Sequence, residues 1–249
     1  MAEALSSLRE LAALAAGAPP RVPVPPRATW LWGPAVAMLR IAFKAFSHVA
    51  IIGKQYVPAE GPLIVACNHF SFLDPPLLAA AFPRPGHVLA KQELLDTPIG
   101  PLISALGIFP VRRGEADVGA LAMVLDALRR GRVVAIFPEG TRGHGVAAGL
   151  KPGHRGVALI AHLSGAPVVP VGISGTEGVQ RLGDVVRNVA TRPHFQVSIG
   201  PPLHVDRQQR IPPSALLTAT TAAIMTAIAA QLPPQYHGVY AQRSNADGS

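Results

Sequence analysis

Short apolar runs alternate with stretches of helical periodicity along most of the chain after residue 49. The runs from Leu63 to Cys67 and from Val133 to Ile136 predict buried strands because they are short, continuous and bounded by polar residues. The clearest helix is predicted from Glu115 to Arg130, where acidic residues begin the segment and arginines followed by Gly131 end it. Strands are predicted near 62–67, 87–90, 108–111, 132–137, 167–173 and 194–200, and helices near 75–82, 98–105, 115–130, 153–164 and 212–231.

This alternation predicts an α/β fold, with a mostly parallel or mixed central sheet flanked by helices and an N-terminal amphipathic, membrane-associating helical segment. We expect four parts. They are an N-terminal helix and proline-rich linker at residues 1–32, an amphipathic interfacial helix at 33–53, the main domain at 54–240 and a disordered tail at 241–249.

The segment at 33–53 is the best candidate for contact with a membrane. Spanning a bilayer takes about 20 mostly apolar residues, and this segment carries Arg40 and Lys44 on one side of a helix. A helix lying in the interface, with its cations toward acidic headgroups, fits these residues better than a span. A helix that packs Val36, Leu39 and Phe43 on the domain core is the alternative interpretation.

The composition favours anionic partners. The 249 residues include 22 basic and 14 acidic side chains, a formal net charge of +8, while charged residues make up only 14% and hydrophobic residues 49%. Aromatic residues are 5%, with no interleaving of basic and aromatic positions, so an anionic membrane surface explains the charge better than nucleic acid does. Cys67 is the only cysteine, which excludes an internal disulfide and a cysteine-based metal cluster.

Candidate chemistry follows the first predicted strand. His69 and Asp74 stand five positions apart in Asn68-His69-Phe70-Ser71-Phe72-Leu73-Asp74, with Asp74 expected to be the N-cap of a helix that begins at Pro75. A carboxylate accepting from Nδ1–H leaves Nε2 free as a general base. Because Ser71 lacks a Gly-x-Ser-x-Gly elbow, direct transfer between two bound substrates is favoured over an acyl-enzyme. Taken alone, this spacing is better explained by a helix cap beside an ordinary loop histidine.

Two further blocks carry cations at strand ends. Arg112 follows the predicted strand at 108–111, and guanidinium groups suit bidentate phosphate recognition. In Phe137-Pro138-Glu139-Gly140-Thr141-Arg142, the glycine permits a tight turn, the glutamate can accept from a hydroxyl or hold a neighbouring basic group, and the arginine can hold phosphate. A solvated edge and a polar turn with an internal Glu–Arg pair are the simpler readings of each block alone.

Together these blocks resemble the glycerolipid acyltransferase family, which includes the 1-acylglycerol-3-phosphate acyltransferases. The family pattern N-H-x-S-x-x-D matches Asn68, His69, Ser71 and Asp74; other blocks match Phe109 to Arg112, Phe137 to Arg142 and Val169 to Val171. The resemblance covers roughly residues 35–205, and the joint order is far more specific than any single block. One departure is Gly143, where many members have serine.

The resemblance implies a function and a set of roles. His69 would be the general base, assisted by Asp74, and the substrate pocket would involve Ser71, Lys91, Arg112, Glu139, Gly140 and Arg142. The reaction would pass a fatty acyl group from acyl-CoA or acyl carrier protein to 1-acylglycerol 3-phosphate, giving phosphatidic acid, with no metal or cofactor. We expect a monotopic or peripheral protein on the cytoplasmic face of a membrane.

Three alternatives remain open from the residues. The same chemistry can serve another lysophospholipid or a glycolipid, because Gly143 begins an unusually glycine-rich stretch. Metal-assisted hydrolysis would use His69, Asp74, Glu139, His144 and His154, although no H-x-x-x-H pair supports it. A non-catalytic membrane-surface binder would leave the ordered chemical blocks unexplained.

Overall fold

The structure of the chain, a computed structural model, describes residues 13, 29–91, 93, 96, 100–101, 106–111, 117–143, 149–188 and 190–241. Most of the N-terminal helix and linker expected at 1–32, most of the helix expected at 98–105 and the tail expected at 241–249, except residue 241, lie outside the described residues.

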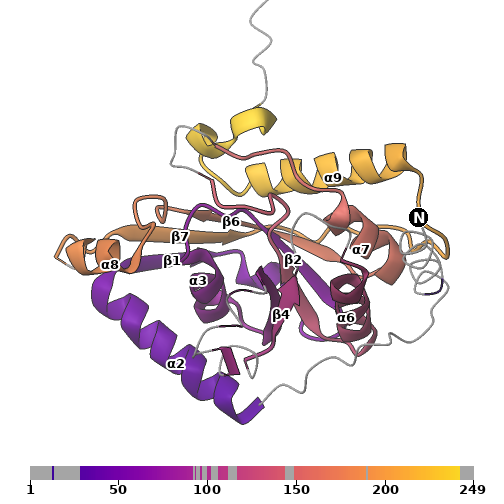
Figure 1. The fold of residues 1–249 in the computed structure, drawn as a ribbon. Coiled ribbons are helices and arrows are strands. Elements are labelled where there is room, and N and C mark those ends of the chain that lie inside the picture. Colours follow the sequence, from indigo (N-terminus) through magenta and orange to yellow (C-terminus); the bar gives the residue numbers. More distant parts are fainter. Residues whose placement is uncertain are drawn as a thin grey trace, which may run out of the picture.

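A seven-stranded mixed sheet forms the centre of the described chain, in the order β1-β7-β6-β2-β5-β3-β4 (Figure 1). The strands are β1 (His48–Ile52), β2 (Leu63–Cys67), β3 (Gly86–Lys91), β4 (Ile108–Val111), β5 (Val133–Ile136), β6 (Val168–Ser174) and β7 (His194–Ile199). The helices are α2 (Thr29–Phe46), α3 (Asp74–Ala81), α6 (Val118–Arg129), α7 (Gly156–Ser164), α8 (Leu182–Asn188) and α9 (Ser214–Ala229), with short 3₁₀ turns η1 (Lys54–Tyr56), η3 (Pro234–Tyr236) and η4 (Gly238–Tyr240).

Helices cover both faces of the sheet, and β2 shows how its sequence allows this. Its five residues are all buried, and alternate side chains of a strand point to opposite faces. Ile64 and Ala66 join the core beneath α6, α7 and α9, whereas Leu63, Val65 and Cys67 join the core beneath α2 and α3. A strand buried on both faces therefore reads as a continuous apolar run.

The directions of β7 and β1 bring their amino ends to the edge of the sheet at which β2, β5 and β6 end. β7 runs antiparallel to β6, with Ser174 opposite Gln196, and β1 runs parallel to β7, with His48 opposite His194. The amino ends of β1 and β7 therefore lie at the same edge as the carboxyl ends of β2, β5 and β6, and this edge carries the chemistry described below.

The structure corrects the expected helix at 33–53. Helix α2 ends at Phe46, and residues 48–52 form β1, which pairs with β7. The alternation of exposed and half-buried residues along β1 is that of an edge strand. Val36 and Phe43 are buried, so this face of α2 packs on the core, as the alternative interpretation predicted.

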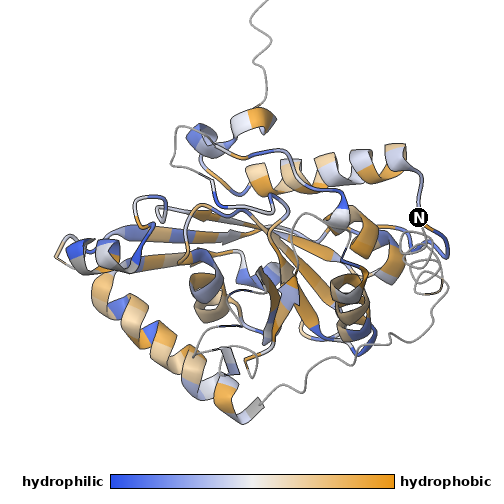
Figure 2. Cartoon of the chain, viewed as in Figure 1, coloured by the Kyte–Doolittle hydropathy of each residue, from blue (hydrophilic) through white to orange (hydrophobic). Residues whose placement is uncertain are grey.

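The other predicted elements agree with the structure to within a few residues where they are described, and the sheet is mixed as expected. Helix α6 begins at Val118 with Asp117 as its cap, whose side chain accepts from the Ala120 amide at 2.9 Å. Helix α8, between β6 and β7, was not predicted. Figure 2 shows the apolar residues gathered on the strands and on the helix faces that meet them.

Candidate active site

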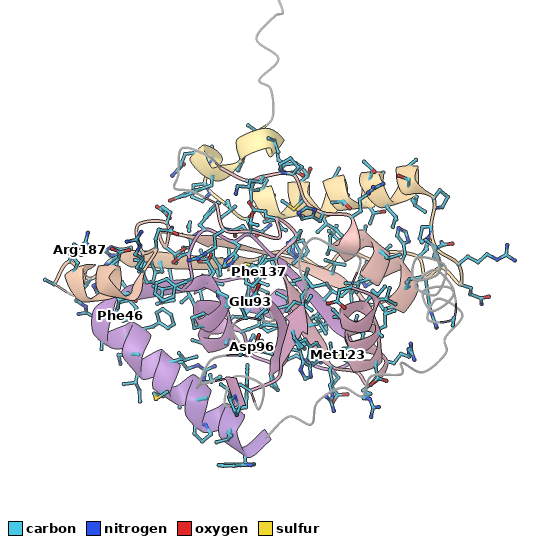
Figure 3. The ribbon with its side chains drawn as sticks, viewed as in Figure 1. Phe46, Glu93, Asp96, Met123, Phe137 and Arg187 are labelled. Carbon is cyan, nitrogen blue, oxygen red and sulfur yellow. The ribbon has the colours of Figure 1, made fainter. Side chains whose placement is uncertain are left out.

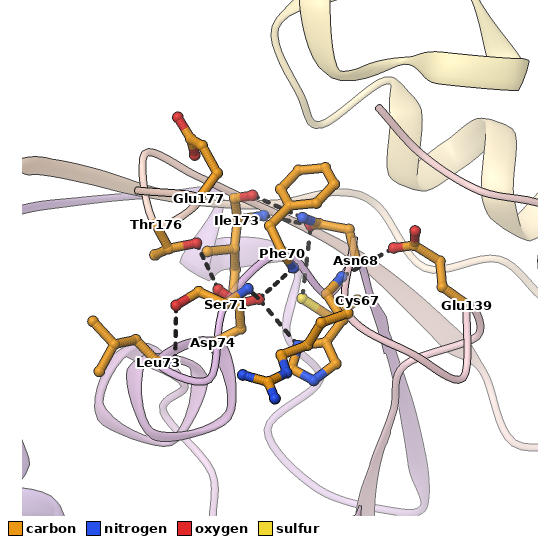
Figure 4. Close-up of polar contacts among 12 residues, drawn as sticks. Cys67, Asn68, Phe70, Ser71, Leu73, Asp74, Glu139, Ile173, Thr176 and Glu177 are labelled. Atoms are coloured by element: carbon orange, nitrogen blue, oxygen red, sulfur yellow. Dashed lines mark hydrogen bonds and ion pairs between the residues drawn. The ribbon is translucent and has the colours of Figure 1, made fainter. Parts of the chain in front are cut away.

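The site begins where β2 ends. Asn68 is fully buried, and its side chain forms two hydrogen bonds to the backbone of β6: Nδ2 donates to the Ile173 carbonyl at 2.8 Å, and Oδ1 accepts from the Ile173 amide at 2.7 Å (Figure 4). The amide side chain continues the strand pairing for one more step after the backbone has turned away. It therefore fixes the point from which the next residue, His69, projects.

His69 and Asp74 form the pair expected from their spacing. Nδ1 of the imidazole lies 3.1 Å from Oδ2 of the carboxylate, which is fully buried, while 12% of the histidine side chain is exposed. Because a carboxylate can only accept, Nδ1 carries the proton and Nε2 presents its lone pair. The ring of Phe137, centred 4.5 Å from the imidazole, packs against it; Figure 3 labels Phe137 at the end of β5.

The Asp74 carboxylate accepts hydrogen bonds from three donors besides His69. Oδ2 also accepts from the Phe70 amide at 2.6 Å and the Ser71 amide at 2.7 Å, and Oδ1 accepts from the Thr176 hydroxyl at 2.7 Å. Helix α3 begins at Asp74 and its N-cap is Leu73, so the prediction that Asp74 is the N-cap is corrected by one residue. The carboxylate closes the loop back on itself, and this is why five residues of separation suffice to bring His69 against it. Thr176, which follows β6, carried no signal in the sequence.

Glu139 contacts the His69 backbone and is almost fully buried, at 2% exposure. Its two oxygens accept from backbone amides, Oε1 from His69 at 3.0 Å and Oε2 from Lys151 at 3.1 Å. Burial raises the pKa of this carboxyl above its ordinary value, and the two amide hydrogen bonds act in the opposite direction. Through these two contacts Glu139 joins the His69 loop to the segment before α7, and its part in substrate binding stays a prediction.

Gly140 makes the turn that allows this arrangement. It adopts a left-handed conformation with φ +67°, and a Cβ placed there would lie 2.8 Å from Cδ2 of His154. The amide of His154 in turn donates to the Pro138 carbonyl at 2.8 Å. The glycine suits both this backbone shape and the close approach of the imidazole, and its part in substrate binding stays a prediction.

Ser71, which was also predicted to bind substrate, lies inside the histidine loop. It is fully buried; its hydroxyl donates to the Val179 carbonyl and accepts from the Leu73 amide at 3.1 Å. These contacts fix the loop in this structure, and the part of Ser71 in substrate binding stays a prediction. Cys67 is inert, because burial raises the pKa of its thiol well above the ordinary value.

Arg142 is joined through its neighbour to the histidine loop. The amide of its neighbour Gly143 donates to the His69 carbonyl at 2.7 Å, and the Lys151 ammonium donates to the Arg142 carbonyl at 2.9 Å. The guanidinium is exposed, with one long contact of 3.4 Å to the Gln180 carbonyl. The predicted Lys91 ends β3, but its side chain, like the whole of Arg112, lies outside the described residues.

A tyrosine near the C-terminus completes the surroundings of the loop. The ring of Tyr236 stacks on Phe70 at 5.5 Å, and its hydroxyl donates to Oε1 of Glu177 at 2.8 Å. Burial, followed by this hydrogen bond, raises the tyrosine pKa to about 12. The contact ties η3 to the turn after β6 that carries Thr176.

Within the described part of the chain, no three His, Cys, Asp or Glu side chains converge as metal ligands. The arrangement places an imidazole beside a buried carboxylate at the carboxyl ends of the parallel strands, a geometry that fits a histidine general base. The same edge carries an exposed guanidinium suited to a phosphate.

Comparison with known proteins gives the family. A family model described as acyltransferase matches residues 48–174, half of the chain, and the chain belongs to this family. It is 28% identical over 188 residues to the 1-acyl-sn-glycerol-3-phosphate acyltransferase of Bacillus subtilis, covering 75% of this chain and 89% of that protein. It is 36% identical over 115 residues to the lyso-ornithine lipid O-acyltransferase of Pseudomonas aeruginosa, covering 45% and 43% respectively.

The fold is shared with a solved structure. The crystal structure of the 1-acyl-sn-glycerophosphate acyltransferase PlsC from Thermotoga maritima matches with a TM-score of 0.60 at 23% identity, over 78% of this chain and 77% of that one. All four sequence blocks that carry the resemblance lie inside the matched residues 48–174. The family predicted from those blocks is confirmed.

Proposed function

We propose that the chain transfers a fatty acyl group from acyl-CoA or acyl carrier protein to the free hydroxyl of 1-acylglycerol 3-phosphate, giving phosphatidic acid. The observation that carries the proposal is the His69–Asp74 pair, 3.1 Å from Nδ1 to Oδ2, with Nε2 left as a base. The relatives named for this reaction, including one matched over 89% of its length, support the choice of substrate.

The transfer proceeds by direct attack. Nε2 of His69 takes the proton of the acceptor hydroxyl as its oxygen attacks the thioester carbonyl, and a tetrahedral intermediate forms. The C–S bond then breaks, the thiolate leaves, and the imidazolium returns the proton to the sulfur. Asp74 stabilises the transient imidazolium because it stays in place as a fixed acceptor. The described residues supply the acid–base step, and the proposal needs neither metal nor cofactor.

Arg142 is the residue proposed to hold the acceptor phosphate. Its side chain is exposed and is joined through Gly143 to the histidine loop, so a phosphate on the guanidinium places the glycerol backbone toward Nε2. Lys151, whose ammonium lies on the Arg142 carbonyl, adds a second positive charge. Arg112 and Lys91 remain predicted contributors.

A membrane surface is the proposed place of reaction, on its cytoplasmic face, where acyl thioesters are made. No helix among the described residues is long and apolar enough to cross a bilayer. Helix α2, however, leaves Trp30, Met38 and Ile41 exposed at 74%, 66% and 71% on the side away from the core. Exposed apolar residues of this size, gathered on one helix face, favour peripheral attachment to lipid.

A second acceptor is favoured by one observation. A relative at 36% identity is named a lyso-ornithine lipid O-acyltransferase, so the same chemistry on a different lysolipid is the alternative. The two differ in whether the acceptor carries a phosphate monoester for Arg142 to hold.

The test is thiol release from oleoyl-CoA by the purified full chain, with 1-acylglycerol 3-phosphate, lyso-ornithine lipid or no acceptor. We expect release only with the phosphate acceptor, and a rise of about tenfold in its KM in Arg142→Gln, since a charge-assisted contact is worth roughly 1.5–3 kcal/mol. Acceptor-dependent release with lyso-ornithine lipid alone would select the alternative. The same assay is then repeated with oleoyl-acyl carrier protein as the donor. If neither donor releases thiol with any of the acceptors, the proposal is contradicted.

A further inference from the structure

A groove of about 820 Å³ lies beside the active site at the same edge of the sheet, between α2, α3 and the amino ends of β1 and β7. None of His69, Asp74, Glu139 or Arg142 lines it. Ser174 and Tyr236 form its wall on the side of the catalytic loop. It is therefore a recess beside the proposed catalytic residues, with lining residues of its own.

The rim of the groove is cationic. Arg40 and Lys44 of α2 face Arg192, which precedes β7, and the imidazoles of His48 and His194 stack between the strands with centroids 4.8 Å apart. All five side chains are exposed, and none of the described residues that line the groove is acidic. The contacts of the arginines are to carbonyl oxygens, Arg40 Nε to Ala80 and Arg192 Nη2 to Lys44, both at 2.8 Å. Their charges are uncompensated by any described carboxylate.

Arg192 has an unusual backbone. Its φ of +44° makes it the one described residue other than glycine with a positive φ. Left-handed backbone is costly for a side chain of this type and is found where surrounding structure enforces it, often at ligand sites. An asparagine or glycine would fit the turn better, so the local conformation gives no reason for an arginine there.

The floor of the groove is apolar, with Phe43, Ala81 and Phe195 among its lining residues. The groove also borders the exposed apolar face of α2. At about 100° per residue along a helix, Arg40 and Lys44 fall between the buried side (Val36, Phe43) and the exposed side (Trp30, Met38, Ile41). If the exposed side of α2 lies in a membrane, the cationic rim of the groove is level with the phosphates of the lipid headgroups.

We propose that this groove binds one anionic phospholipid of the surrounding membrane, with its phosphate between Arg192 and the α2 cations and an acyl chain over the apolar floor. The occupant carries negative charge together with apolar bulk, and it enters sideways from the surface on which α2 lies. A soluble polyanion matches the rim but not the floor. The inference goes beyond the proposed function, because the bound lipid is neither acceptor nor donor.

The first test measures sedimentation of the full chain with phosphatidylcholine vesicles, with and without phosphatidic acid. Arg192→Asn removes the cation and suits the left-handed turn, so it leaves the fold intact; Lys44→Gln leaves the backbone acceptor of Arg192 in place. Each is expected to weaken binding to acidic vesicles about fivefold and to leave binding to neutral vesicles unchanged. Arg210→Asn, at an exposed arginine outside the groove, is the matched control. An equal loss in the control, or no loss in the groove variants, would overturn the proposal.

The second test separates a bound lipid from general surface charge and from a soluble ligand. Native mass spectrometry of the detergent-purified chain with added phosphatidic acid should show one retained lipid in wild type and a loss of retention in Arg192→Asn. Retention equal in both would overturn the proposal, as would coenzyme A binding in the absence of lipid that is abolished by the same substitution. Both tests read binding alone, so they are independent of whether the proposed acyl transfer is observed.

Discussion

Thr176 Oγ1 lies 2.7 Å from Asp74 Oδ1, so a residue two positions after β6 holds the carboxylate that contacts His69 in the loop after β2. The two residues are 102 positions apart in the chain, but the strands they follow, β6 and β2, are neighbours in the sheet. Asp74 therefore has a fixed partner on each oxygen, and rotation of the carboxylate away from His69 is prevented.

Thr176→Val keeps the shape of the side chain but removes this donor. An oxygen of a buried carboxylate is left unsatisfied, which costs roughly 1–3 kcal/mol, and we expect kcat to fall about tenfold with little change in KM. Thr176→Ser should restore most of the rate. Steady-state kinetics of the two variants checks this, and a kcat for Thr176→Val equal to that of wild type would show that Asp74 needs no second anchor.

Glu139→Gln tests the two hydrogen bonds that join the His69 loop to the segment before α7. An amide presents one acceptor where the carboxylate has two, so either the His69 or the Lys151 amide loses its partner, and we expect a loss of about 1–3 kcal/mol in unfolding free energy together with reduced activity.

The pH dependence of this loss has a definite sign. Burial raises the pKa of Glu139 above its ordinary 4.5, so the folded protein binds the proton more tightly than the unfolded chain does. Wild type loses stability as pH rises through the folded pKa, while glutamine does not titrate. The difference between wild type and variant should shrink as pH rises above 4.5, as measured by urea unfolding; a difference that grows would contradict the pKa direction.

Gly140→Ala and Gly131→Ala separate backbone strain from crowding. Both glycines are left-handed, with φ +67° and +70°, but a Cβ at Gly131 meets nothing within 4 Å, whereas at Gly140 it meets the His154 ring at 2.8 Å. We expect Gly131→Ala to cost about 1–2 kcal/mol and Gly140→Ala about 1–3 kcal/mol more, with loss of activity only in the second. Equal losses in thermal unfolding would mean that the imidazole moves aside freely.

Ile41→Glu tests the attachment surface of α2. Burying an isoleucine side chain is worth about 1.5–3 kcal/mol, so binding to vesicles should fall at least about tenfold. Leu216→Glu, at a position 39% exposed on α9, is the control and should bind as wild type does. Equal binding by Ile41→Glu and wild type would remove α2 from the membrane contact.

The sequence predicted the strands around the site well, because a strand buried on both faces is a short continuous apolar run bounded by polar or turn residues. It failed between residues 47 and 53, where the helix pattern of α2 runs directly into β1. The apolar residues Val49, Ile51 and Ile52 continue the hydrophobic stretch, and only pairing with β7 makes them a strand.

The sequence likewise predicted one part of the candidate site and missed another. The His69–Asp74 pair is local, so spacing revealed it. Thr176 is 102 residues from its partner and its type is common, so no local pattern identifies it. The burial of Ser71 and Glu139, and their hydrogen bonds within and beside the histidine loop, are visible only in the fold, because they depend on residues distant in the sequence.

The most direct test of the central claim is acceptor-dependent thiol release by His69→Ala, beside His204→Ala as a control at an exposed histidine outside the site. If Nε2 of His69 is the base, the first variant should lose about 10²–10⁴-fold in kcat while retaining its fold by circular dichroism, and the control should match wild type. Full acceptor-dependent release by a folded His69→Ala would contradict the account.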